Sequence, residues 1–336
     1  MAELTAPNLD WKKIVSRYAV PDVRQAIWQV ATSLIPYLIL FYLALRSVEI
    51  SLWLTVPLCV LAAGFMTRTF IIFHDCGHGS FFKSQKANDW VGILTGLVTF
   101  TAYHNWKHAH AIHHATAGDL DRRGVGDVYT MTLDEFKAAP WYVKAGYAVM
   151  RNPVAMFLIG APLMFLLVER IPPRKGRREI AGVWWTNLAV VAIVAAMGFG
   201  FGWRAYLIVQ LLTLYIGSIG GVWLFYVQHQ FQGVYWRRHA DWNYLDASLK
   251  GSSFYRLPKL MQWFSGNIGF HHIHHLSSKI PSYNLERAYR ENPMFHVKPL
   301  TLLSSLQCLK WRVYDEANKR MVWWDALKVV QKTAGT

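Results

Sequence analysis

Residues 51–78 read SLWLTVPLCVLAAGFMTRTFIIFHDCGH, and this stretch decides the kind of fold to expect. Its first part, 51–73, is an apolar run in which Arg68 is the one charged residue. At about 1.5 Å per helical residue, such a run exceeds the roughly 30 Å thickness of a bilayer's hydrocarbon core. His74 and His78 follow at once, four residues apart and therefore on one helix face. The stretch predicts a membrane-spanning helix that ends in a pair of imidazoles.

Three other apolar runs are long enough to cross a bilayer, namely 27–45, 183–201 and 204–227. Two further runs, 90–103 and 153–168, would give only about 21–24 Å of helix, which is more typical of interfacial or re-entrant segments. We therefore predict an all-α integral membrane protein with four transmembrane helices in two hairpins.

The distribution of charge supports this division and predicts the orientation. The chain has 35 Lys and Arg and a net charge of +15, although 53% of its 336 residues are hydrophobic. Thirty-two of these cations lie in the intervals 1–24, 74–182 and 228–336, which four crossings would place on one side. Such an excess marks the cytoplasmic side. We predict one domain, 1–336, with a cytosolic helical cap formed by 74–182 and 228–336.

Two classes of protein are disfavoured by composition. The basic residues flank apolar runs and form no separate basic domain, which argues against nucleic-acid binding. The three cysteines, Cys59, Cys76 and Cys308, form no CxxC pair, which argues against a disulfide framework or a thiolate metal site and fits a reducing compartment. The first 24 residues are polar and predict no secretory signal peptide.

Most of the 14 histidines fall into three clusters, HDCGH, HAIHH and HHIHH. Spacings of three and four residues let each cluster direct two or three imidazoles at one point. Neutral imidazole is a good ligand for iron, copper, zinc and nickel. A further histidine, His229, directly follows the fourth long run and is a candidate ninth ligand beside His74, His78, His110, His113, His114, His271, His274 and His275.

A single metal centre requires all three clusters on one side of the membrane. Clusters one and two share a side only if 90–103 does not cross. Clusters two and three share a side only if 153–168 does not cross, because the two long runs between them already make an even number of crossings. Both runs are also short for a span, which independently predicts that neither crosses the membrane.

Eight or nine imidazoles are too many for one metal, so the sequence indicates two. The HExxH of zinc proteases and the PCxxC of zinc deaminases are both absent. Two redox-active metals at a membrane surface suggest oxygen activation, for which iron is the natural choice. Removal of hydrogen from an unactivated methylene is beyond acid–base side chains, so we expect no catalytic residue outside the metal centre.

The clusters carry a resemblance to the membrane fatty acid desaturases. Three segments are similar to that family's three histidine boxes and follow the same order. They are HDCGHGSFF at 74–82, WKHAHAIHH at 106–114 and GNIGFHHIHHLSSKIPSYNLE at 266–286. Three further segments resemble the bacterial acyl-lipid desaturases, particularly the delta-5 type. They are RRGVGD at 122–127, GVWLFYVQH at 221–229 and GSSFYRLPKL at 251–260.

This resemblance implies a four-span architecture with a cytosolic cap that holds two non-haem iron ions. It implies that the nine histidines named above are the ligands, and that O2 and two electrons are used per turnover. The implied reaction introduces a cis double bond into a phospholipid-linked acyl chain, at the cytoplasmic face of a bacterial cell's inner membrane.

Other polar residues near the boxes are candidates to orient the ligands. Asp75, His108, Asp119 and Asp127 form this set. Asp75 has the alternative of a helix-end carboxylate, and the other two aspartates have the alternative of pairing with Arg122 and Arg123. His272 points about 100° away from His271 on a helix and is expected to miss the metals.

The chain contains no haem-binding stretch and no ferredoxin-type cysteine set, so a separate protein such as ferredoxin or flavodoxin should deliver the electrons. A basic cap would attract a small acidic carrier.

Two other functions fit the sequence less well. A hydroxylase or ketolase of an alkane, lipid or carotenoid would use the same boxes. A histidine-rich metal transporter would place ionisable residues within its spans, and here the spans hold almost none. The motifs do not specify the double-bond position, the choice between an acyl-lipid and an acyl-thioester substrate, the identity of the electron donor or the oligomeric state.

Overall fold

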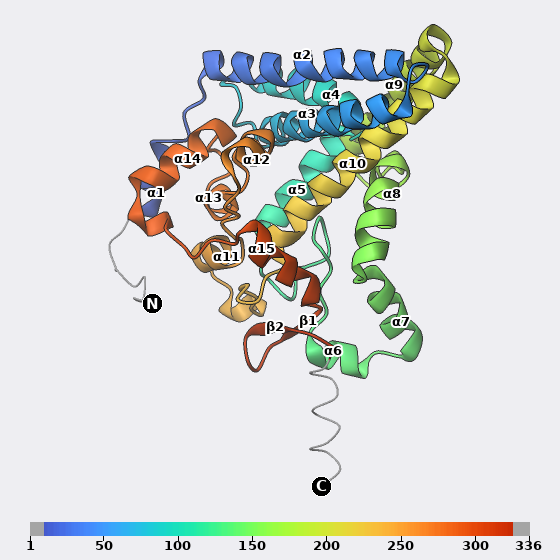
Figure 1. Cartoon of the computed structure of the whole chain (residues 1–336). Helices are drawn as coiled ribbons and strands as arrows, with labels where there is room; N and C mark the ends of the chain where they lie inside the picture. Colours follow the sequence, from blue (N-terminus) through green and yellow to red (C-terminus); the bar gives the residue numbers. More distant parts are fainter. Residues whose placement is uncertain (1–9, 325–336) are drawn as a thin grey trace.

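The computed structural model of the protein describes residues 10–324, so the ends of the expected domain 1–336 lie outside the described residues. Within the described residues, four helices are long and apolar enough to cross a membrane (Figure 1). They are α2 (Val23–Ser47), α3 (Leu52–His78), α9 (Arg177–Phe201) and α10 (Trp203–His229). The prediction of a mostly helical protein with four membrane-length helices is confirmed.

All four helices are longer than the apolar runs that predicted them, because polar residues extend their ends. Asp22 caps α2, accepting hydrogen bonds from the backbone N–H groups of Arg24 and Gln25 at 2.8 and 3.1 Å. Helix α9 begins six residues before its apolar run, at Arg177. Helix α3 continues past its run to His78, so the first histidine pair belongs to the spanning helix itself.

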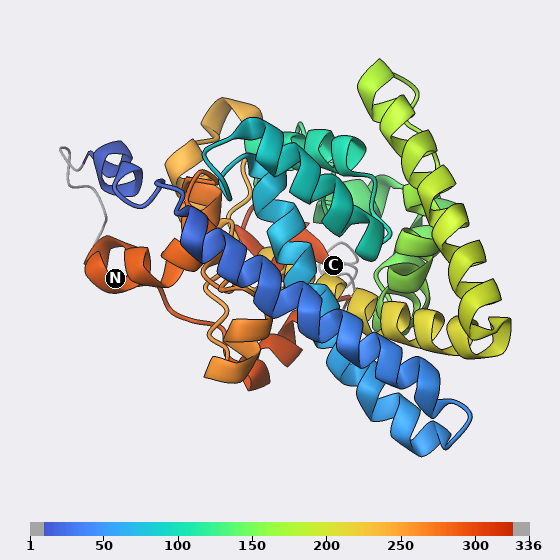
Figure 2. The ribbon, with the colours of Figure 1, turned by 90° about the horizontal axis from the view of Figure 1, so that it is seen from above.

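The spans form two hairpins whose turns lie at the same end. Residues 48–51 join α2 to α3, and Gly202, with φ +87°, is the whole connection between α9 and α10. An ion pair between Arg204 and Glu49, 3.3 Å long, links the two turns. A core of buried apolar side chains, including Phe41, Met66 and Leu214, packs the hairpins together. In Figure 2 α2 lies along α3, and α9 stands apart on the side away from them.

The two shorter apolar runs form different structures. Residues 90–103 lie largely in α4 (Gln85–Val98), a 14-residue helix that packs against α3. Residues 153–168 form a π-helix (Val154–Gly160), α8 (Ala161–Leu166) and the start of a 3-10 turn (Val168–Arg170). Together with α7 (Trp141–Met150) they make a helix pair bent by 65°, as in a re-entrant loop or a broken span. That these segments do not cross stays a prediction.

The remaining elements gather around the end of the spans opposite the hairpin turns (Figure 1). They are α1 (Trp11–Ser16), α5 (Tyr103–Thr116), α6 (Leu133–Ala138), α11 (Tyr244–Lys250), α12 (Lys259–Phe264), α13 (His271–Leu276), α14 (Ser282–Glu291), α15 (Leu302–Ser305) and 3-10 turns at His239–Asp241, Pro293–Phe295 and Leu306–Lys310.

Within residues 10–324, one β-hairpin departs from the all-α prediction. Strands β1 (Val313–Asp315) and β2 (Arg320–Val322) pair antiparallel, with Tyr314 opposite Met321. The Asp315 side chain accepts hydrogen bonds from the backbone and the side chain of Asn318 and so closes the turn between the strands. A three-residue strand is too short to show a clear alternation of apolar and polar residues in the sequence.

Candidate metal centre

The first histidine pair is fixed by the way α3 ends. Gly79 adopts the left-handed conformation at φ +64°. Its N–H donates to the carbonyl of Cys76 at 3.0 Å, and the N–H of Ser80 donates to that of Asp75 at 3.1 Å. This is a Schellman cap, which terminates the helix directly after His78. His74 and His78 therefore lie one above the other on the last turns of α3.

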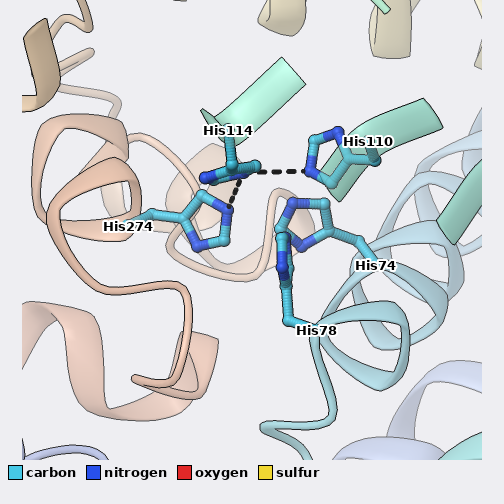
Figure 3. A group of neighbouring side chains, drawn as sticks. All are labelled: His74, His78, His110, His114 and His274. Carbon is cyan, nitrogen blue, oxygen red and sulfur yellow. Dashed lines mark hydrogen bonds between the residues drawn. The ribbon is translucent and has the colours of Figure 1, made fainter. Parts of the chain in front are cut away.

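Three further elements bring the other clustered histidines to the same place. Helix α5 carries the second cluster, the short helix α13 carries the third, and His229 is the last residue of α10. Figure 3 shows the rings of five histidines from α3, α5 and α13 pointing toward a common centre.

These five residues form the first group that could hold a metal ion. One nitrogen from each lies within 4.8 Å of those of all the others. Nε2 of His114 is 3.1 Å from Nε2 of His110 and 3.1 Å from Nε2 of His274. We call this set the five-histidine cluster: His74, His78, His110, His114 and His274.

A second group lies beside the first and consists of His113, His229 and His275, again within 4.8 Å of one another. Nε2 of His113 is 3.2 Å from Nε2 of His229. On its other side, Nε2 of His229 is 2.9 Å from Nε2 of His271. With His271 included, this second cluster has four buried imidazoles.

Neighbours in the sequence are divided between the two clusters. His113 and His114 are consecutive on α5, and His274 and His275 are consecutive on α13, yet each pair contributes one ring to each cluster. Consecutive residues on a helix point about 100° apart, so one short helix can serve two sites. The rings of His114 and His275 stack with their centroids 4.1 Å apart, which makes the clusters contiguous.

Burial keeps several of these imidazoles in the neutral form that binds metals. The pKa values of His110, His271, His274 and His275 all lie well below the ordinary value, because burial disfavours the imidazolium and neighbouring histidines add repulsion. All four side chains are therefore uncharged at neutral pH, with a lone pair on one ring nitrogen.

The residues present fit a pair of metal ions. Buried Nε2 atoms of His78 and His275, one in each cluster, have no hydrogen-bond partner among the described residues. A bound cation would supply the missing partner in each cluster. The donor set is all imidazole nitrogen, which suits iron, copper, zinc or nickel.

Comparison with known proteins gives the family. The sequence profile described as "Fatty acid desaturase" matches residues 51–298, which include all nine clustered histidines. The chain belongs to the fatty acid desaturase family. It is 46% identical over 318 residues to "Fatty acid desaturase" of Bacillus subtilis (strain 168), covering 94% of this chain and 90% of that protein.

Two cyanobacterial relatives extend the comparison. The "sn-1 acyl-lipid omega-3 desaturase (ferredoxin)" of Synechocystis sp. is 30% identical to this desaturase over 256 residues, covering 70% of this chain and 67% of that protein. The "sn-1 oleoyl-lipid 12-desaturase" of the same organism is 28% identical over 253 residues, covering 70% and 68%.

Two of the predicted carboxylates contact ligand-candidate histidines of the desaturase. Oδ1 of Asp75 lies 3.2 Å from Nδ1 of His74, and Asp127 hydrogen-bonds Nδ1 of His113. A carboxylate that accepts the Nδ1 proton leaves Nε2 free for a metal and holds the ring in place. Both contacts therefore direct Nε2 into the clusters.

The other two predicted supporting residues are placed elsewhere. His108 is exposed on α5, about 200° around the helix from His110. Asp119 is buried but accepts hydrogen bonds from Arg122 and His239, at 2.6 and 2.8 Å, so the alternative of arginine pairing holds for it. His272 hydrogen-bonds through Nε2 to the carbonyl of Phe295 at 2.8 Å, away from the clusters, as expected.

Several contacts around the site were not predicted from the sequence. The backbone N–H of Ser282 donates to Oδ2 of Asp75 at 2.6 Å, and Lys279 donates to the carbonyl of His78 at 2.7 Å. The indole of Trp106 stacks on His110, with ring centroids 4.3 Å apart. Trp106 stands four residues before His110, a helical spacing that was the available signal for this contact.

Proposed function

We propose that this desaturase introduces a cis double bond into phospholipid-linked acyl chains, using O2, two electrons and two non-haem iron ions. The observation that carries the proposal is the pair of contiguous histidine clusters at one end of four membrane-length helices. Such a site meets the lipid where the headgroup region begins and needs no soluble form of the acyl chain.

The proposed ligands are the nine clustered histidines. One iron would be held by His74, His78, His110, His114 and His274, and the other by His113, His229, His271 and His275. Iron bound there would supply the oxidising power that removes two hydrogens from adjacent methylenes. The protein's own part is to hold the imidazoles in fixed orientations, in part through Asp75 and Asp127, and to exclude water by burial.

The substrate and the electron donor are inferred from the relatives. Two of them are named for acyl-lipid or oleoyl-lipid substrates, and one for ferredoxin. We infer a membrane phospholipid as substrate and a separate ferredoxin or flavodoxin as donor. The excess of Lys and Arg on the histidine-bearing side favours a cytoplasmic catalytic face in a bacterial inner membrane, where an acidic carrier would be attracted.

Expression in a bacterial host without desaturases tests this function. Mass spectrometry of the host's phospholipids should show a new monounsaturated acyl chain with the wild-type protein and none with His114→Ala. His108→Ala is the matched control, because it removes an exposed histidine from the same helix. A hydroxylated product would contradict desaturation, and full activity of His114→Ala would contradict the ligand assignment.

The same spectra locate the double bond. The resemblance to delta-5 enzymes predicts a bond between the fifth and sixth carbons, counted from the carboxyl end. The relatives include omega-3 and 12-desaturases, so a bond at another position would correct the predicted subtype without changing the class of reaction.

A further inference from the structure

Arg68 is the one charged residue in the apolar part of α3, and the metal clusters do not use it. Its side chain is buried, with the residue only 6% exposed. One guanidinium nitrogen donates to the carbonyl of Trp263, and the guanidinium carbon lies 4.0 Å from the centre of the Trp263 ring. Its Nε has no partner among the described residues. A buried guanidinium that keeps one donor without a partner is a candidate contact for an anion.

Arg68 lines a cavity of about 440 Å³ between α2, α3, α12 and α14. This volume is in the range of small-molecule sites. The walls also carry the polar side chains of Lys259, Gln262 and Asn267. Their N–H groups donate to neighbouring protein groups, so a ligand would share or replace these hydrogen bonds. The ring of Trp28 forms part of the wall.

Helix lengths predict that the cavity lies near the depth of the lipid headgroups, on the histidine-bearing side. Arg68 is sixteen residues, or about 24 Å, from the far end of α3 at Leu52, and Trp28 is about 29 Å from the far end of α2 at Ser47. Both distances approach the roughly 30 Å thickness of the hydrocarbon core. Trp28 and Leu260 are each 69% exposed beside the cavity, as expected of an aromatic and apolar rim in contact with lipid.

The charges of the cavity match a phosphodiester. Arg68 and Lys259 are cationic, and Glu286 is the anionic residue in the lining. The Glu286 carboxylate already accepts hydrogen bonds from Lys259 and Gln262, at 2.5 and 2.8 Å. The lining therefore has a net charge of one positive unit, and a phosphodiester carries one negative unit.

The cavity wall is joined to the metal centre by a short chain of hydrogen bonds. Asn267 donates to the carbonyl of Ser282 at 3.2 Å, and the N–H of Ser282 donates to Asp75, which contacts His74. Along α3, Arg68 precedes His74 by six residues, a rise of about 9 Å. A headgroup bound here would therefore lie close to the histidine clusters at which its acyl chain is proposed to react.

We propose that this cavity binds the phosphodiester of the phospholipid substrate, with Arg68 and Lys259 as its contacts. This inference rests on the proposed acyl-lipid function and adds the site that recognises the lipid. It also makes the headgroup the fixed point from which the position of the double bond is set.

Native mass spectrometry of the full chain, released from detergent with dimyristoyl phosphatidylglycerol, tests the site. Loss of a charge-assisted hydrogen bond at a buried group costs about 1.5–3 kcal/mol, so Arg68→Gln should weaken lipid binding about tenfold or more. Lys259 is exposed and screened by solvent, so Lys259→Gln should weaken lipid binding about two- to fivefold. Lys137→Gln is the matched control, a remote lysine that also pairs with a carboxylate, and should bind as the wild type does. Binding of dimyristoylglycerol, which lacks the phosphate, should be the same in all four proteins.

The Lys259→Gln variant is expected to fold, because the Lys259 side chain is 79% exposed and its replacement leaves the core intact. Equal lipid binding by wild type and Lys259→Gln would overturn the proposal. Inorganic phosphate that binds as tightly as the lipid would also overturn it, by assigning the site to a free anion.

Product analysis in the desaturase-free host separates this inference from the proposed function. Wild-type protein that binds the lipid but makes no unsaturated chain would contradict the function and leave the headgroup site supported. In an assay of the purified proteins at limiting phospholipid, full activity of Arg68→Gln and Lys259→Gln would contradict the headgroup site alone.

Discussion

His113 and Asp127 are joined by a hydrogen bond between Nδ1 of the imidazole and the carboxylate, 14 residues apart in the sequence. Nε2 of the same ring lies 3.2 Å from Nε2 of His229. The carboxylate thereby fixes both the proton and the direction of a ring in the second cluster, which makes it the clearest target for testing how the site is built.

Replacement of Asp127 by Asn should lower iron affinity by about 10- to 100-fold, the usual effect of losing a carboxylate that orients a ligating histidine. The measurement is iron retained per chain against a graded competing chelator. Asp121→Asn is the control, because Asp121 contacts Arg238 and the backbone of His239 and no cluster histidine. Equal losses in the two variants would show that the effect is general and not due to the His113 contact.

His229→Ala should remove one of two bound irons, because it removes a ligand from the second cluster and leaves the five-histidine cluster complete. Metal analysis of the purified variant should give about one iron per chain, with no unsaturated product. His108→Ala should keep both irons. If His229→Ala also kept both, His229 would be a buried neighbour and not a ligand.

Removal of the metal should destabilise the protein. Buried imidazole nitrogens such as those of His78 and His275 would lose their partner, and a ligand present at about 100 times its dissociation constant stabilises a fold by roughly 2.7 kcal/mol. We expect chelation to lower the unfolding temperature by several degrees in wild type and by less in His114→Ala. An unfolding temperature that does not respond to chelator in the wild type would mean that metal is not part of the folded structure.

The proposed headgroup site predicts the end of the acyl chain from which the position of the double bond is fixed. If Arg68 and Lys259 hold the phosphodiester, the double bond should form at a constant distance from the ester carbonyl in chains of 14, 16 and 18 carbons. Feeding these acids to the expressing host and locating the bond by mass spectrometry tests this. A bond at a constant distance from the methyl end would instead indicate a site that measures from the tail.

The parts of the structure that could be predicted from sequence are those governed by local periodicity. Apolar runs identified the four spans because bilayer thickness sets a minimum length. The histidine spacings predicted shared faces because helical geometry repeats every three or four residues. His229 could be included because the end of α10 had to lie on the same side as the other clusters.

The parts that could not be predicted depend on the path of the chain between helices. Gly126, with φ +70°, has its backbone against α5, where a Cβ would lie 3.2 Å from that of His113. Asp127 follows this close approach and meets His113, whereas Asp119 turns toward Arg122. Arg68 likewise meets Trp263 across 195 residues, a contact that no local pattern encodes.

The metal content of the full chain tests the proposed di-iron centre directly. It is measured by inductively coupled plasma mass spectrometry on protein purified without chelators. Two contiguous clusters of five and four histidines predict two irons per chain. One iron per chain, or zinc in place of iron, would contradict the di-iron account.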